Sequence, residues 1–120
     1  MEKDETVILA GATGYLGDYI AQELYQRGIQ TIILARNTKK AAHLANSHTK
    51  IIKSEVTDSK TLHGYFEGVT TVISTVGITR QKDGLKYMDV DYQANKNLLQ
   101  EAKKAGVKKF VYVSVLNGKQ

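Results

Sequence analysis

The sequence contains no cysteine and no proline among its 120 residues. Without cysteine, disulfide bonds, thiolate metal sites and cysteine nucleophiles are excluded. The lack of proline fits a chain of regular helices and strands whose turns depend on glycine. No segment approaches the roughly 20 consecutive apolar residues of a membrane span, and the first five residues are mostly charged, unlike a secretory leader. We therefore expect a cytoplasmic protein that forms one domain over residues 1–120.

Basic residues outnumber acidic ones, and the formal net charge is +5. Lysine pairs occur at positions 39–40, 103–104 and 108–109, separated by apolar segments, so these pairs form no continuous stripe. No nucleic-acid-binding motif accompanies this charge, and we expect no nucleic-acid partner. The three histidines are scattered without the spacing of metal ligands, so we expect exposed histidines and no metal site.

Apolar β-branched runs alternate with amphipathic segments along the whole chain. The expected strands are 7–10, 31–35, 50–53, 71–75 and 110–114, and the expected helices are 15–27, 39–46, 59–66 and 88–105, with a loop over 78–86. Leu16, Ile20 and Leu24 are expected to line the core face of the first helix, and Gly28 to end it. Thr38 is the expected N-cap of the second helix, and Ser59 or Asp58 that of the third.

This alternation predicts an α/β protein with a doubly wound parallel sheet of five strands. The expected strand order is 3-2-1-4-5, as in the dinucleotide-binding fold without its sixth strand. The order 2-1-3-4-5 of flavodoxin-like proteins is the alternative.

A glycine-rich turn lies between the first expected strand and the first expected helix. It reads Gly11-Ala12-Thr13-Gly14-Tyr15-Leu16-Gly17. Gly11 permits a sharp turn off the strand, Gly14 leaves room for a pyrophosphate against the backbone, and Gly17 lets the helix lie close to the sheet. The helix N-terminus adds partial positive charge. We therefore assign these seven residues to a cofactor-binding turn.

The spacing Gly-x-x-Gly-x-x-Gly resembles the short-chain dehydrogenase/reductase superfamily, in particular its extended and atypical members. These are epimerase-like and NmrA-like proteins, whose turn reads Gly-Ala-Thr-Gly-x-x-Gly. The resemblance implies a Rossmann fold that binds NAD(P), truncated before the family's substrate-binding region. It also implies an oxidoreductase or epimerase that is inactive as this chain alone, or, alternatively, a non-catalytic NADP sensor of the NmrA-like type.

Arg36 follows the second expected strand, 19 residues after Gly17, and no acid lies beside it in the sequence. An acidic residue at this point takes the ribose 2′-hydroxyl of NAD, whereas arginine favours the 2′-phosphate of NADP. Lys39 and Lys40 would add positive charge. We therefore expect NADP to be preferred, with NAD as the alternative cofactor.

Three further segments are assigned to the cofactor by the resemblance. The stretch Ser54-Glu55-Val56-Thr57-Asp58 resembles the family's Gly-Asp-Leu-Thr-Asp, whose first acid accepts a hydrogen bond from the adenine amino group. The resemblance implies that Glu55 and Val56 bind the cofactor. The segment Thr75-Val76-Gly77 resembles the small residues that pass the pyrophosphate and ribose, and Ser114 is expected to line the cofactor at the end of the fifth strand.

Tyr92 and Lys96 match the family's catalytic pattern Tyr-x-x-x-Lys, but they lie on the helix before the fifth strand. In the family the catalytic pair lies on the helix after that strand. Val115 and Leu116 stand where the catalytic serine is usual. No complete Ser-Tyr-Lys set is therefore present, and we assign no catalytic residue.

The missing later elements of the family would leave apolar surface exposed near the fifth strand and the last long helix. Large exposed apolar patches favour association. We therefore expect a homo-oligomer formed through this region.

Overall fold

The computed structural model describes residues 5–11, 15–76 and 84–113, with the backbone alone for 84–91. The elements in chain order are β1 (Thr6–Ala10), α1 (Tyr15–Gln26), β2 (Gln30–Ala35), α2 (Thr38–Ala41), the 3-10 helix η2 (Ala42–Leu44), β3 (Thr49–Lys53), the 3-10 helix η3 (Ser59–Leu62), β4 (Thr71–Ser74), α3 (Gly84–Ala105) and β5 (Lys109–Tyr112). Each expected strand is present, with bounds that differ by one or two residues.

All five strands pair in parallel in one sheet of order β3-β2-β1-β4-β5. The expected doubly wound fold is confirmed, and the flavodoxin-like order is excluded. The central strand β1 pairs with β2 on one edge and with β4 on the other. The chain thus winds outward from β1 in both directions, and the crossovers diverge beside its carboxyl end.

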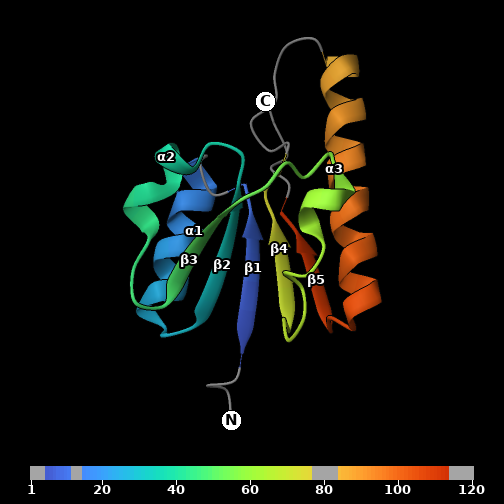
Figure 1. Ribbon diagram of the computed structural model, residues 1–120. Coiled ribbons are helices and arrows are strands. Elements are labelled where there is room, and N and C mark those ends of the chain that lie inside the picture. The colour runs from blue at the N-terminus through green and yellow to red at the C-terminus, as the bar shows by residue number, and fades with distance from the viewer. Residues whose placement is uncertain (1–4, 12–14, 77–83, 114–120) are drawn as a thin grey trace.

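Helices cover both faces of the sheet, as Figure 1 shows with α1 and α2 on one side and α3 on the other. Successive strand residues point to opposite faces, so each strand contributes to two cores. The core under α3 and η3 contains Ile8, Ala10, Leu34, Leu62, Phe66, Val69, Val72, Leu98 and Ala102. The core under α1 and α2 contains Leu9, Ala21, Ile33, Ala35, Ala41 and Leu44. None of the helices in the described part combines the length and apolar character needed to cross a membrane.

The buried face of α1 differs from the expected one. The helix buries Gly17, Ala21 and Leu24, whereas Leu16 and Ile20 are half-buried at the flanks. Small residues at the centre of the contact let the helix approach the sheet closely. The helix ends as expected at Gly28, whose φ is +72°, and the Ile29 N–H donates to the Leu24 carbonyl oxygen at 3.1 Å.

The second and third helices are shorter than expected, and one of their caps was wrongly assigned. Asn37, rather than Thr38, is the N-cap of α2, because its side-chain oxygen accepts from the backbone N–H groups of Lys39 and Lys40. The third is a single 3-10 helix, η3, capped by Asp58. The last long helix begins earlier than expected, at Gly84, so the end of the predicted loop over 78–86 is helical.

Candidate functional site

The carboxyl ends of β1 and β4 are joined by Thr75, the residue that follows β4. Its N–H donates to the Ala10 carbonyl oxygen at 2.9 Å, and its hydroxyl donates to the Gly11 carbonyl oxygen at 3.0 Å. Gly11 has a φ of +97°, and a Cβ on it would lie 2.3 Å from the Thr75 Oγ1. The chain therefore leaves β1 by a turn that accepts glycine and excludes a side chain.

The start of α1 follows this turn at Tyr15, whose side chain is exposed, while Gly17 is buried against the sheet. Leu16 is half-buried. The predicted phosphate-binding residues Ala12, Thr13 and Gly14 lie outside the described residues. The described part of this turn consists of Gly11, where the chain leaves β1, and the N-terminus of α1 beside the carboxyl end of that central strand.

Asp18 places a carboxylate in the first turn of α1, which sequence reasoning did not consider. Its Oδ2 lies 2.6 Å from His43 Nε2, and Gln22 Nε2 donates to its Oδ1 at 2.5 Å. The hydrogen bond from His43 lowers the pKa of Asp18, against a smaller rise from partial burial. This acid is therefore held by η2 and by its own helix.

Arg36 and Glu55, predicted independently, lie beside each other. The Ser54 N–H donates to the Ala35 carbonyl oxygen at 3.0 Å, which extends the pairing of β2 and β3 by one step. This brings Arg36 Nη1 within 3.8 Å of Glu55 Oε1. The guanidinium side chain is 80% exposed, so most of its N–H donors remain open to solvent or to an anion.

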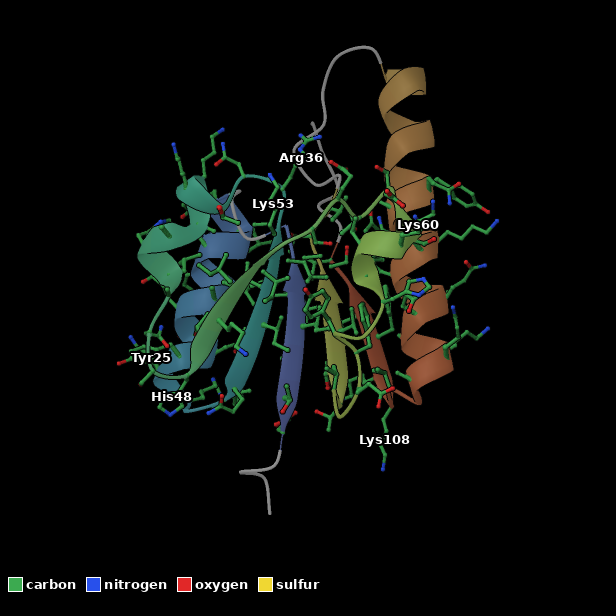
Figure 2. The ribbon with its side chains drawn as sticks, viewed as in Figure 1. Tyr25, Arg36, His48, Lys53, Lys60 and Lys108 are labelled. Atoms are coloured by element: carbon green, nitrogen blue, oxygen red, sulfur yellow. The ribbon has the colours of Figure 1, made fainter. Side chains whose placement is uncertain are left out.

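Further cations surround Arg36 at this end of the sheet. Lys39 and Lys40 follow in the first turn of α2, where both side chains are exposed. Lys53 ends β3, and Figure 2 shows it beside Arg36 at the end of the sheet opposite Tyr25 and His48. The carboxyl ends of β2 and β3 therefore form a positively charged corner, in which the carboxylate of Glu55 lies beside Arg36.

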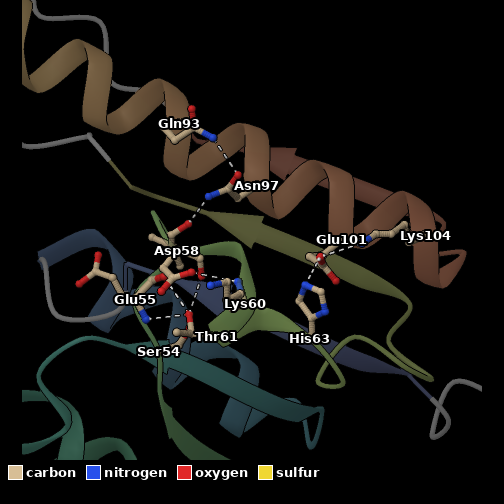
Figure 3. A network of polar contacts seen from close by, with 11 residues as sticks. Ser54, Glu55, Asp58, Lys60, Thr61, His63, Gln93, Asn97, Glu101 and Lys104 are labelled. Atoms are coloured by element: carbon tan, nitrogen blue, oxygen red, sulfur yellow. Dashed lines mark hydrogen bonds and ion pairs between the residues drawn. The ribbon is translucent and has the colours of Figure 1, made fainter.

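Side-chain contacts fix the loop that carries Glu55 and Val56 on both sides (Figure 3). The Asn97 Nδ2 of α3 donates to the Val56 carbonyl oxygen at 2.9 Å, and Gln93 in turn donates to Asn97. The Thr61 hydroxyl accepts from the Glu55 N–H at 3.1 Å. Sequence reasoning missed Asn97, which lies in the sequence Asn97-Leu98-Leu99 of the helix before the fifth strand.

The exit of β4 is fixed from α3 in a similar way. The buried Ser74 hydroxyl donates to Asn95 Oδ1 at 2.6 Å and accepts from the Val76 N–H at 3.2 Å. Val76 packs against the core under α3. Of the predicted segment Thr75-Val76-Gly77, the first two residues thus lie beside the β1 turn, and Gly77 is outside the described part of the chain.

The two residues of the Tyr-x-x-x-Lys match lie on α3, between β4 and β5. Lys96 Nζ lies 5.9 Å from the centre of the Tyr92 ring, and Tyr92 is 66% exposed. This is a surface cation–π pair on the helix that precedes β5. Ser114, the other family-derived candidate near β5, lies outside the described residues.

These features gather at the carboxyl edge of a parallel sheet, where the winding direction reverses. Ligands of open α/β sheets bind in this crevice. The described residues fit a dinucleotide: the β1 turn has no side chain at Gly11, and the corner at Arg36 offers exposed guanidinium donors for a phosphate. The fold and the site therefore define a dinucleotide-binding domain of the doubly wound class.

Comparison with known proteins identifies the family. A family model described as NAD(P)H-binding matches residues 11–120, and the chain belongs to this family. The photosystem II assembly factor Ycf39 of Synechocystis sp. is 33% identical over 110 residues, which are 92% of this chain and 33% of that protein. The chloroplastic divinyl chlorophyllide a 8-vinyl-reductase of Arabidopsis thaliana is 32% identical over 127 aligned residues, covering 95% of this chain and 30% of that protein.

Solved structures agree with this assignment. The NADPH-dependent quinone oxidoreductase of Escherichia coli, solved with NADPH, superposes with a TM-score of 0.71 at 26% identity, over 92% of this chain and 37% of that one. The resemblance to extended and atypical short-chain dehydrogenases/reductases is thus confirmed. The chain spans about a third of the length of the two curated relatives.

Proposed function

We propose that this chain is the NADP-binding domain of an atypical short-chain dehydrogenase/reductase and that it is inactive without the rest of that architecture. The observation that carries the preference for NADP is Arg36 at the carboxyl end of β2, with its guanidinium 80% exposed. A planar guanidinium binds a phosphate through two parallel hydrogen bonds. The pyrophosphate would lie at the turn from Gly11 to Gly17, and the adenine beside Glu55 and Val56.

Calorimetric titration with NADP and NAD tests this proposal. We expect the wild-type chain to bind NADP more tightly than NAD. Arg36→Ala should weaken NADP binding by about tenfold, because charge-assisted hydrogen bonds to the 2′-phosphate are lost, and should leave NAD binding nearly unchanged.

Arg27→Ala is the matched control. Arg27 is also exposed and forms a pair at 3.2 Å with Glu23 of α1; it lies just after α1, at the amino ends of the strands. Its removal should change neither affinity. If the wild-type chain binds neither nucleotide, the proposed function is wrong.

A second candidate is a non-catalytic NADP sensor, and one observation favours it. The relative from Synechocystis sp. is by its name an assembly factor and not a reductase, which agrees with a non-catalytic role. The full-length protein distinguishes the two: a reductase consumes NADPH with an acceptor present, whereas a sensor binds NADPH and NADP⁺ with different affinities without consuming either.

Homo-oligomer formation and the expected cytoplasmic location also stay predictions.

A further inference from the structure

The carboxylate of Glu55 is held next to the group that the proposed function assigns to the 2′-phosphate. Glu55 Oε1 lies 3.8 Å from Arg36 Nη1. Its other oxygen, Oε2, accepts from the Thr57 hydroxyl at 2.9 Å. The Glu55 N–H is bound by Thr61, and the next carbonyl, that of Val56, is bound by Asn97. These contacts fix both the backbone and the side chain of this acid.

The charges around this pair make the carboxylate an internal competitor for Arg36. The next acid in the chain, Asp58, is directed elsewhere, because its side chain accepts from the Lys60 N–H. Lys39, Lys40 and Lys53 are exposed cations at the same corner. An incoming phosphate therefore meets several positive charges and the carboxylate of Glu55, which already lies beside the guanidinium. Like charges near one cation repel each other, and the repulsion is only partly screened at this distance.

We propose that Glu55 is a specificity-determining residue, whose carboxylate competes with the 2′-phosphate for Arg36 and so limits the preference for NADP. This inference rests on the proposed function, because it presupposes that Arg36 faces the 2′-phosphate. It differs from the role implied by family resemblance. An acid that accepts a hydrogen bond from the adenine amino group strengthens the binding of both cofactors equally, since both carry adenine. A carboxylate that competes for Arg36 weakens the binding of NADP alone.

Glu55→Gln separates these two roles, because glutamine keeps the shape and the oxygen that accepts from Thr57 but carries no charge. Calorimetric titrations would measure the dissociation constants of NADP and NAD at low and at high salt. We expect NADP to bind about threefold more tightly to the variant at low salt, the size of a half-exposed charge interaction, and less so at high salt. The affinity for NAD should stay the same.

Three further variants keep the test decisive. Glu67→Gln removes the same charge from an exposed acid that precedes the amino end of β4, and should alter neither affinity. Glu55→Asp keeps the charge but shortens the side chain, and should tighten NADP binding by less than Glu55→Gln does. In an Arg36→Ala background the effect of Glu55→Gln on NADP should shrink, because the contested group is gone.

The outcomes distinguish this inference from the proposed function. If Glu55→Gln weakens NADP and NAD equally, Glu55 binds adenine; the competition is then refuted while NADP binding stands. Unchanged affinities for both nucleotides would also overturn the inference. Failure of the wild-type chain to bind either nucleotide overturns the proposed function, and this inference with it.

Discussion

Gly11 has a φ of +97°, and a Cβ added to it would lie 2.3 Å from the Thr75 Oγ1 and 3.1 Å from the Thr75 carbonyl carbon. Gly28 also has a positive φ, +72°, but a Cβ there would meet nothing within 4 Å. Both positions therefore require a backbone conformation that favours glycine, but only Gly11 also lacks space for a side chain. At Gly11 both apply, and the neighbour that fills the space is a buried residue with fixed hydrogen bonds.

We expect Gly11→Ala to lower the free energy of unfolding by about 3 kcal/mol, the sum of a left-handed conformation and a buried steric clash. Gly28→Ala, the control, should cost about 1 kcal/mol, for the conformation alone. Urea denaturation of both variants measures the difference. Equal losses of unfolding free energy in the two variants would mean that Thr75 moves aside without destabilising the fold.

A side-chain pair, Asp18 with His43, links α1 to η2. Asp18 in α1 and His43 in η2 join two elements that cover the same face of the sheet, and Asp18 is partly shielded at 30% exposure. The hydrogen bond from His43 lowers the pKa of Asp18 below its ordinary value of 3.8. Folding therefore favours the deprotonated carboxylate, and the stabilisation is present above about pH 4 and lost as the pH falls through the folded-state pKa.

Asp18→Asn should consequently lower the free energy of unfolding at pH 7 by about 0.5 kcal/mol, the usual size of a partly exposed pair. The difference from the wild type should shrink as the pH falls below about 4 and through the lowered pKa of Asp18, because the wild-type carboxylate then becomes protonated as well. Urea denaturation between pH 7 and pH 3 measures this. Glu23→Gln, which breaks the exposed pair of Glu23 with Arg27, is the control for a change of charge on this helix; a loss for Asp18→Asn that stays constant with pH would contradict the prediction.

The sequence was sufficient to predict the order of elements and the strand order, because alternation of apolar runs and helices in a parallel sheet leaves few topologies. It was not sufficient for the face of α1. Ranking by hydrophobicity selects Leu16 and Ile20, whereas close packing on the sheet selects Gly17 and Ala21. The cap at Asn37 was missed for a related reason, since asparagine and threonine are both good caps and one position separates them.

For the candidate site, the sequence predicted Arg36 and Glu55 individually but not the contact between them. Their distance depends on the register of β2 against β3 and on the extra hydrogen bond from Ser54 to Ala35, neither of which a single sequence determines. The support from Asn97 was likewise invisible, because its partner is a backbone carbonyl 41 positions away.

In the whole molecule, one part of the sheet lacks a covering helix among the described residues. Phe110 packs into the core under α3, so Val111 faces the opposite side, in register with Ile73. There α1 and α2 cover β1, β2 and β3, and Val111 is 36% exposed. In the described part of the chain β5 pairs with β4 alone and is an edge strand. An apolar edge strand favours pairing between copies.

We therefore expect the 120-residue chain to self-associate through β5, with an average mass that rises with concentration in analytical ultracentrifugation. Val111→Lys should weaken the association by about tenfold, because it places a charge on the edge strand and removes an apolar contact. Tyr19→Lys, on the exposed face of α1, is the control that alters charge and apolar surface away from β5, and it should leave the association unchanged. A wild-type chain that stays monomeric at several hundred micromolar would refute the role of β5, whereas equal weakening by both variants would attribute the association to general surface hydrophobicity.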